Sequence, residues 1–199
     1  MMTDALNHSL FLIINADPDT PAALVDAGIL IAGRVIYLLP PMLAAIWLWG
    51  NSQYRNSALK ALVVTAIALG CNQLIGIYMP TQRPFELGVG YTFLAHAPTP
   101  SFPSNHLTIF FSVGLCLMRG AASRLGVLVL ISGLVVAWAR VFVGIHFPLD
   151  MAGAVVVAIV VYAAVTPVWN RCGMTITTRL ERVYRRIMAL PISAGWLRE

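Results

Sequence analysis

Apolar stretches long enough to cross a lipid bilayer constrain this chain more than any other feature. They cover residues 23–49, 58–79, 104–118, 125–143 and 148–169. A helix needs about 20 apolar residues to span the hydrocarbon core, so only the 104–118 stretch is clearly short. Charged residues make up 11% of the chain and hydrophobic residues 59%, whereas soluble domains carry about 25% charge. The sequence predicts an all-α integral membrane protein, with five to six transmembrane helices in one domain over residues 1–199.

Two further segments are predicted to lie along the membrane surface. Residues 3–14 have helical apolar spacing but are too short to span, so residues 1–21 are expected to form an interfacial helix. A helix folded back onto the bundle is the alternative. Residues 171–199 place four arginines among apolar residues at helical spacing: Arg179, Arg182, Arg185 and Arg186. This tail is predicted to be a basic amphipathic helix on anionic lipid, or otherwise an ordinary solvated helix.

The basic residues predict which way the chain crosses the membrane. Of the 13 Lys and Arg residues, ten fall in or near two polar turns and in the tail: Arg55, Lys60, Arg119, Arg124, Arg171, Arg179, Arg182, Arg185, Arg186 and Arg198. Segments rich in Lys and Arg stay on the cytoplasmic side. The tail at 171–199 is therefore expected in the cytoplasm, and the segments 80–103 and 139–150 on the outer face of the membrane.

Composition also argues against several other classes of protein. The net charge of +5 reports topology in a membrane protein, so nucleic-acid binding is not expected. The three cysteines, Cys71, Cys116 and Cys172, have neither disulfide nor metal-ligand spacing. We therefore predict no metal site and no cofactor.

Four polar residues inside the predicted spans have two readings each. Asp26 and Arg34 lie in the first span, where an arginine is either functional or structural, and a structural one either snorkels to the interface or forms an ion pair. Asn72 and Gln73 lie in the second span, where amides usually hydrogen-bond to a neighbouring helix and less often contact a substrate.

Six residues suited to phosphate chemistry are predicted to meet at the outer face. They are Arg83, Ser104, His106, Arg140, His146 and Asp150. Guanidinium groups bind phosphate oxygens as a planar fork and offset the charge of a phosphoryl-transfer transition state. The Ser104 hydroxyl and the free N–H groups of Asn105 and His106 at a helix start could bind the same oxygens. Taken singly, such residues often only meet lipid headgroups or cap a helix.

His146 and Asp150 have the spacing of a nucleophile relay. Four residues apart, they share one face if a helix has begun by His146, and even in a turn they could meet. The carboxylate could accept one ring N–H and leave the other nitrogen of His146 free to attack phosphorus. His106 is then available as the general acid for the leaving oxygen.

Three motifs in this stretch resemble those of a known family. They are Arg83-Pro84, Pro103-Ser104-Asn105-His106, and Ala139-Arg140 followed by His146 and Asp150. They are similar to the signature of the type-2 phosphatidic acid phosphatase superfamily, which reads Lys-x6-Arg-Pro, Pro-Ser-Gly-His and Ser-Arg-x5-His-x3-Asp. Within that superfamily the chain most resembles the bacitracin-resistance type of undecaprenyl-diphosphate phosphatases. The similarity extends from about residue 46 through the fifth span.

The resemblance implies a helical fold shared with haloperoxidases, a metal-free reaction and a role for each matching residue. Phosphate would be bound by Arg83 and Arg140 with help from Ser104. His106 would be the acid, His146 the nucleophile that forms a phosphohistidine, and Asp150 its orienting partner.

The loop at 80–103 also contains His96, which the subfamily likeness suggests for the second phosphate of a diphosphate. Three positions depart from the pattern: Gly76 replaces its lysine, Asn105 replaces the glycine of Pro-Ser-Gly-His, and Ala139 replaces the serine of Ser-Arg.

The function that the subfamily likeness implies is hydrolysis of undecaprenyl diphosphate to undecaprenyl phosphate at the outer face of a bacterial inner membrane. This reaction would recycle the lipid carrier of cell-wall synthesis and confer bacitracin resistance. The expected partners are this substrate and membrane lipids, and the sequence leaves the oligomeric state open. One alternative is the same chemistry on phosphatidylglycerol phosphate, phosphatidic acid, diacylglycerol diphosphate or lipid A. Another is a lipid-phosphate transporter or flippase that binds without hydrolysis. The spans exclude a soluble haloperoxidase.

Overall fold

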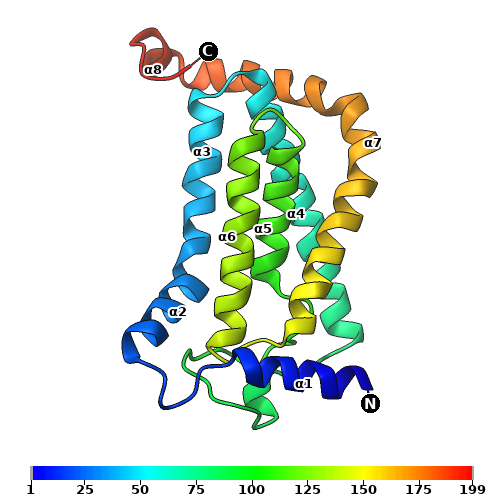
Figure 1. Cartoon of the computed structure of the whole chain (residues 1–199). Helices are drawn as coiled ribbons and strands as arrows, with labels where there is room; N and C mark the ends of the chain where they lie inside the picture. Colours follow the sequence, from blue (N-terminus) through cyan, green and yellow to red (C-terminus); the bar gives the residue numbers. More distant parts are fainter. Residues whose placement is uncertain (1, 199) are drawn as a thin grey trace.

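The computed structural model describes residues 2–198, and every regular element in that range is helical (Figure 1). Two of these elements, η1 and η2, are short 3-10 helices. In chain order the elements are α1 (Met2–Ile14), α2 (Ala22–Arg34), η1 (Val35–Leu38), α3 (Leu39–Trp49), α4 (Ser52–Tyr78), η2 (Pro84–Glu86), α5 (Asn105–Met118), α6 (Ser123–Phe142), α7 (Pro148–Ile187) and α8 (Ala189–Ser193).

Four helical segments are long and apolar enough to cross a membrane: Ala22–Trp49, α4, α6 and α7. Helix α5 has 14 residues and is shorter. It packs against α4, α6 and α7 in the middle of the bundle (Figure 1), and its residues Leu107, Phe110 and Leu117 are buried. The all-α membrane fold expected from the sequence is confirmed.

Helices α5 and α6 approach closely because glycines line their contact. A Cβ atom at Gly126 would lie 2.1 Å from the backbone nitrogen of Met118, and one at Gly133 would lie 2.7 Å from Cβ of Phe110. Small residues at a crossing allow the backbones of membrane helices to pack together. This packing fixes the start of α5 relative to the end of α6, and both ends carry predicted site residues.

The first predicted span is not one continuous α-helix. It is interrupted by η1, and Pro40 and Pro41 follow in the first turn of α3. Arg34 and Asp26 are both exposed, and neither has a polar partner within residues 2–198. Of the readings of Arg34, the structure therefore removes only the ion pair, and it does so only among the described residues.

Helix α7 continues through residue 170, where the fifth span was predicted to end. Most of the predicted tail is therefore helical and continues the helix of the fifth span without a break, and its placement on anionic lipid stays a prediction. Figure 1 shows α7 turning so that its C-terminal part crosses the end of the bundle, and Pro167 within it lacks the N–H that continues the helical ladder. In this part Glu181 is buried and pairs with Arg55 of α4 at 3.5 Å.

Helix α1 lies across the opposite end of the bundle (Figure 1). Its Phe11 is fully buried and packs edge-on against Phe147, with ring centroids 5.2 Å apart. Asn15, just after α1, donates from Nδ2 to the carbonyls of Tyr91 (2.9 Å) and Phe142 (3.0 Å). The N-terminal segment thus ties the loop between α4 and α5 to the end of α6. The two segments predicted to share one face, 80–103 and 139–150, do lie at this one end.

Candidate active site

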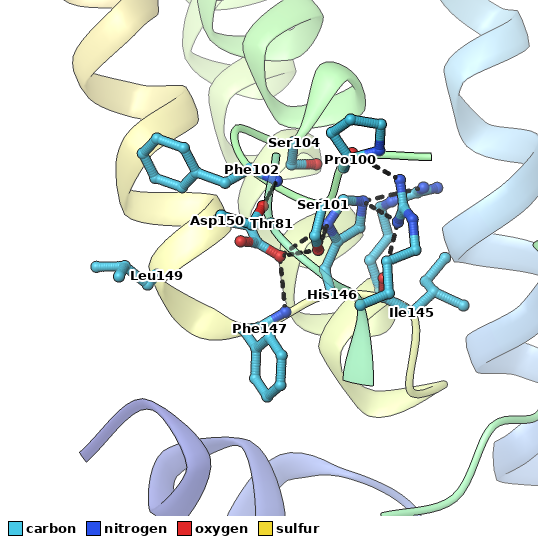
Figure 2. A network of polar contacts seen from close by, with 12 residues as sticks. Thr81, Pro100, Ser101, Phe102, Ser104, Ile145, His146, Phe147, Leu149 and Asp150 are labelled. Carbon is cyan, nitrogen blue, oxygen red and sulfur yellow. Dashed lines mark hydrogen bonds and ion pairs between the residues drawn. The ribbon is translucent and has the colours of Figure 1, made fainter. Parts of the chain in front are cut away.

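The loop between α4 and α5 folds back on itself before α5 begins. Ser101 donates its backbone N–H to the carbonyl of Thr81 (2.9 Å), and Phe102 donates its N–H to the Thr81 hydroxyl (2.9 Å). The Glu86 carboxylate accepts the backbone N–H of Arg83 (2.9 Å). These bonds fix the loop so that Arg83 lines a pocket, while the Ser101 side chain lies beside His146 and Asp150 (Figure 2).

Arg83 uses all of its guanidinium donors inside the protein. Nε donates to the carbonyl of Thr99 (2.8 Å), and Nη2 donates to the Thr99 hydroxyl (3.2 Å) and the Pro100 carbonyl (3.3 Å). Nη1 donates to the carbonyl of Ile145 (2.8 Å) and lies 3.2 Å from His146 Nε2. A guanidinium has five N–H groups. Arg83 therefore joins the α4–α5 loop to the α6–α7 turn and keeps one donor facing His146.

Arg140, near the end of α6, is bonded much less completely. Its Nη1 donates to the carbonyl of Ala32 (2.9 Å) and its Nη2 lies 3.4 Å from His146 Nε2. Its Nε is buried and has no hydrogen-bond partner among the described residues. A buried, unsatisfied charged donor is costly, which indicates that Arg140 is poised for an anionic ligand.

The surroundings of His146 fix which ring nitrogen carries the proton. Nε2 faces the guanidinium groups of Arg83 and Arg140, and these groups can only donate. Nε2 must therefore present its lone pair, and the proton must sit on Nδ1. Nδ1 in turn lies 3.0 Å from Asp150 Oδ2, which accepts that proton in a hydrogen bond. The unprotonated nitrogen required of a nucleophile is the one that faces the arginines.

Burial lowers the pKa of His146 from its usual value near 6.5 to about 4. The hydrogen bond to Asp150 opposes this shift, and the charge of Arg140 adds to it. The imidazole is therefore neutral at physiological pH, as a nucleophile must be to attack with its lone pair.

Ser101 is a member of this relay that the sequence did not reveal. Asp150 Oδ2 accepts three hydrogen bonds: from the Ser101 hydroxyl at 2.5 Å, from His146, and from the backbone N–H of Phe147 at 2.9 Å (Figure 2). Ser101 Oγ also lies 3.3 Å from His146 Nδ1. Its position two residues before Pro103 does not indicate this role, because a serine in a loop is usually a turn residue.

A polar pocket of about 450 Å³ lies in front of His146. The predicted residues Arg83, His96, Asn105, His106, Arg140 and His146 all line it. Ser104 precedes the first residue of α5, and its hydroxyl is buried with no partner among residues 2–198. A hydroxyl in such a position needs a ligand or a water to bond to. All eight predicted site residues thus meet at one end of the bundle, with Asp150 behind His146.

His96 differs from the other pocket residues because its ring is bonded within its own loop. Its Nδ1 lies 2.9 Å from the carbonyl of Ala97, to which it donates. Burial lowers the pKa of His96, with the charges of Arg83 and Arg140 adding to the effect. A neutral ring bonded in this way leaves Nε2 as an acceptor, so His96 donates to a phosphate only when it is protonated. Its phosphate-binding role stays a prediction.

Comparison with known proteins gives the family. Residues 57–174 match the model of the PAP2 superfamily. This chain belongs to that superfamily. YbjG of Escherichia coli (strain K12) is 35% identical over 198 residues, which cover all of both chains. Undecaprenyl-diphosphatase BcrC of Bacillus subtilis (strain 168) is 31% identical over 156 residues, 78% of this chain and 80% of BcrC.

The fold is that of the superfamily as well. The crystal structure of Aquifex aeolicus LpxE superposes with a TM-score of 0.63 over 80% of this chain and 93% of LpxE, at 21% identity. The chain is thus a multi-pass membrane protein and a phosphatase of the PAP2 type, and the resemblance seen in the motifs is confirmed.

One of its departures from the PAP2 pattern has a visible structural setting. Ala139 stands where the pattern has serine, and it is fully buried in an apolar cluster with Ala32, Phe142 and Val143. A hydroxyl at this position would need a partner inside an apolar environment.

The protonation of this PAP2 site can be measured directly. We expect His146 to stay neutral at pH 5.5, with its proton on Nδ1, because its pKa lies at about 4. Nitrogen-15 NMR of histidine-labelled protein reports both ring nitrogens, and the spectrum of His146→Gln assigns the signal. Since the unfolded chain binds this proton near pH 6.5, the fold loses stability as the pH falls from 6.5 towards 4. Titration of the His146 signal near pH 6.5 would contradict the assignment.

Proposed function

We propose that this protein hydrolyses undecaprenyl diphosphate to undecaprenyl phosphate and inorganic phosphate. The observation that carries the proposal is the lone pair of His146 Nε2, which faces Arg83 and Arg140 in a pocket beside an apolar groove. A nucleophile next to two phosphate-binding cations suits attack on phosphorus. The likeness to BcrC, named as an undecaprenyl-diphosphatase, supports this substrate.

In the first step, the terminal phosphate of the substrate lies against Arg83, Arg140 and Ser104. Nε2 of His146 attacks its phosphorus, so that a P–N bond forms and the bond from phosphorus to the bridging oxygen breaks. His106 donates a proton to that oxygen, and undecaprenyl phosphate leaves.

In the second step, His106 accepts a proton from a water molecule. The oxygen of that water attacks the phosphohistidine, the P–N bond breaks and inorganic phosphate is released. Asp150 accepts the Nδ1–H of His146 throughout, which stabilises the positive ring of the intermediate. When the P–N bond breaks, its electron pair returns to Nε2.

We also propose that the reaction needs neither metal nor cofactor, because two guanidinium groups offset the phosphate charge. Full activity of the purified protein in excess EDTA is the expected result.

An apolar groove of about 890 Å³ beside the pocket supports a lipid substrate. Its walls come from η1, α3, α4 and α5 and include Tyr37, Leu43, Leu62 and Ile109. His106 lines both the groove and the polar pocket. The α3 and α4 residues that line the groove extend over roughly 15 Å at 1.5 Å per residue. The groove can therefore cover the first part of a hydrocarbon chain whose diphosphate lies in the pocket.

A panel of lipid phosphates tests the substrate. Purified protein in detergent is expected to release phosphate fastest from undecaprenyl diphosphate. The competing lipids are phosphatidylglycerol phosphate, phosphatidic acid, diacylglycerol diphosphate and lipid A. A higher kcat/KM for any monophosphate lipid would overturn the proposed substrate but keep the reaction class. Binding of these lipids with no phosphate release from any of them would favour a transporter.

Filling the groove should affect long substrates only. We expect Ala66→Trp, in the groove wall, to raise KM for undecaprenyl diphosphate by about tenfold, because an indole there displaces the chain from apolar contacts worth roughly 1.4 kcal/mol. Isopentenyl diphosphate, whose five-carbon chain is too short to enter, should be hydrolysed as before. The matched control is Val63→Trp, on the exposed side of the same helix and outside the groove. Equal effects of both tryptophans on the long substrate would argue against the groove.

The orientation in the membrane and the physiological role are parts of the same proposal. With the arginine-rich end in the cytoplasm, the pocket faces the outside of the inner membrane, where the diphosphate carrier is released. Tyr91, exposed in the loop near the pocket, offers a test. Tyr91→Cys in a variant lacking the native cysteines should react with a membrane-impermeant maleimide added from outside. Expression should raise bacitracin resistance, since hydrolysis depletes the lipid that the drug binds.

A further inference from the structure

Helix α4 explains why the lysine of the family pattern can be absent. Gly76 stands at that position and lines the pocket. A Cβ atom there would lie 3.2 Å from Cβ of Pro100, which is tighter than most side-chain contacts. The loop that carries Thr99 and Pro100 to Arg83 therefore packs directly against Gly76. Any replacement for the lysine on this face of α4 must come from an adjacent turn, and Asn72 lies one turn earlier.

Asn72 is buried, with 4% of its surface exposed, and both hydrogens of its amide are used. Nδ2 donates to Asn105 Oδ1 and to Thr108 Oγ1, each at 2.9 Å. The Thr108 hydroxyl donates its own hydrogen to the Ser104 carbonyl at 3.0 Å, so it can only accept from Asn72. This chain of bonds fixes which way the Asn72 amide points, with its nitrogen towards α5.

The same bonds fix the amide of Asn105. Because Oδ1 of Asn105 is turned towards Asn72, its Nδ2 points the other way. Asn105 is exposed, lines the pocket and follows Ser104, whose hydroxyl has no partner among the described residues. The Asn105 Nδ2 hydrogens take no partner from residues 2–198 either. The start of α5 therefore offers a side-chain N–H donor to the pocket in addition to the backbone N–H groups of a helix start.

We propose that Asn105 donates from Nδ2 to a phosphate oxygen of the substrate in place of the family's lysine, and that Asn72 is the positioning residue that orients this amide. The inference rests on one part of the proposed phosphatase function, namely that the pocket binds phosphate. Asn72 Oδ1 is buried without a partner among the described residues, so Asn72 acts on the phosphate only through Asn105. A neutral amide thus replaces a cation, so the pocket relies on Arg83 and Arg140 for its positive charge.

A double-mutant cycle tests the inference. The probe is inorganic phosphate, titrated into the detergent-solubilised full chain and followed by phosphorus-31 NMR. Asn105→Gly restores the family's glycine and should weaken phosphate binding about tenfold, the effect of losing one hydrogen bond to a charged group. Asn72→Ala should weaken it by a similar factor, since Asn105 is no longer oriented. Because Asn72 acts through Asn105, the double variant should bind no more weakly than Asn105→Gly alone.

Several outcomes would overturn the inference. A full further loss on adding Asn72→Ala to Asn105→Gly would mean that Asn72 is structural, and wild-type phosphate affinity in Asn105→Gly would mean that its amide does not touch phosphate. If Asn72→Ala does not fold, Asn72→Ser and the Asn105→Gly result still decide the question. The probe is inorganic phosphate and not a lipid, so this test is independent of the substrate. If Asn72 and Asn105 are coupled in phosphate binding but the protein does not hydrolyse undecaprenyl diphosphate, only the proposed substrate is overturned.

Discussion

His146→Ala is expected to lower kcat by about 10⁴-fold or more, because the attacking nitrogen is lost and no P–N bond can form. Substrate labelled in its terminal phosphate should leave label on the wild-type protein after rapid acid-free quenching with detergent. The linkage should be labile to acid and stable to base, as a phosphoramidate is. The variant should carry no label.

Two controls make this result specific. His8→Ala removes a histidine that stacks on Phe147 outside the pocket, and it should retain the label. Ser101→Ala removes one of three donors to Asp150 but keeps the nucleophile, so it should also form the phosphoenzyme, more slowly. A labelled phosphoenzyme that survives in His146→Ala would rule out the proposed mechanism.

Replacing Arg83 or Arg140 with lysine should affect activity and thermal stability differently. Arg140→Lys should lower kcat/KM by about 100-fold, as expected for a lost donor to the transition state, and leave the thermal midpoint nearly unchanged. Arg83→Lys should also lower activity, but it strips donors from the buried carbonyl of Ile145 and from the carbonyls of Thr99 and Pro100. We therefore expect its thermal midpoint in detergent to fall by about 4 °C or more.

The measurement is a comparison of both variants at one scan rate, since membrane proteins often unfold irreversibly. Lys60, on α4 and outside the pocket, provides a control for charge: Lys60→Arg should alter neither quantity by much, because its cation can still reach Thr166. Equal loss of thermal stability in Arg83→Lys and Arg140→Lys would contradict the division of roles drawn from their hydrogen bonds.

The bonding of Arg83 and Arg140 illustrates what the motif could not predict. Both arginines fit the family pattern equally, and the sequence assigns both to phosphate. In the structure Arg83 is bonded to three backbone carbonyls, whereas Arg140 is bonded to one. Those carbonyls belong to residues 16 to 108 positions away in the chain, and no local pattern encodes such contacts.

The sequence did not predict the roles of Ser101 and Asn72 for the same reason. Each role depends on a hydrogen bond to a residue of another segment, Asp150 for Ser101 and Asn105 for Asn72. The amide of Asn72 was expected to bond to a neighbouring helix, and it does, but only the packing of α4 on α5 makes that neighbour a pocket residue. The fifth span and the basic tail were predicted as two segments because the character of the chain changes after Asn170, and the structure joins them in one helix, since such a change does not stop a helix.

The sequence by itself determined the membrane class, the approximate spans, the meeting of distant segments at one end and the identity of the nucleophile candidate. These follow from hydropathy and from short motifs, which are local properties of the chain. Tertiary structure alone decided the tautomer of His146, the serine behind its carboxylate, the unequal arginines and the continuous course of α7. These depend on the distance and direction between groups far apart in sequence, which are set only when the helices pack.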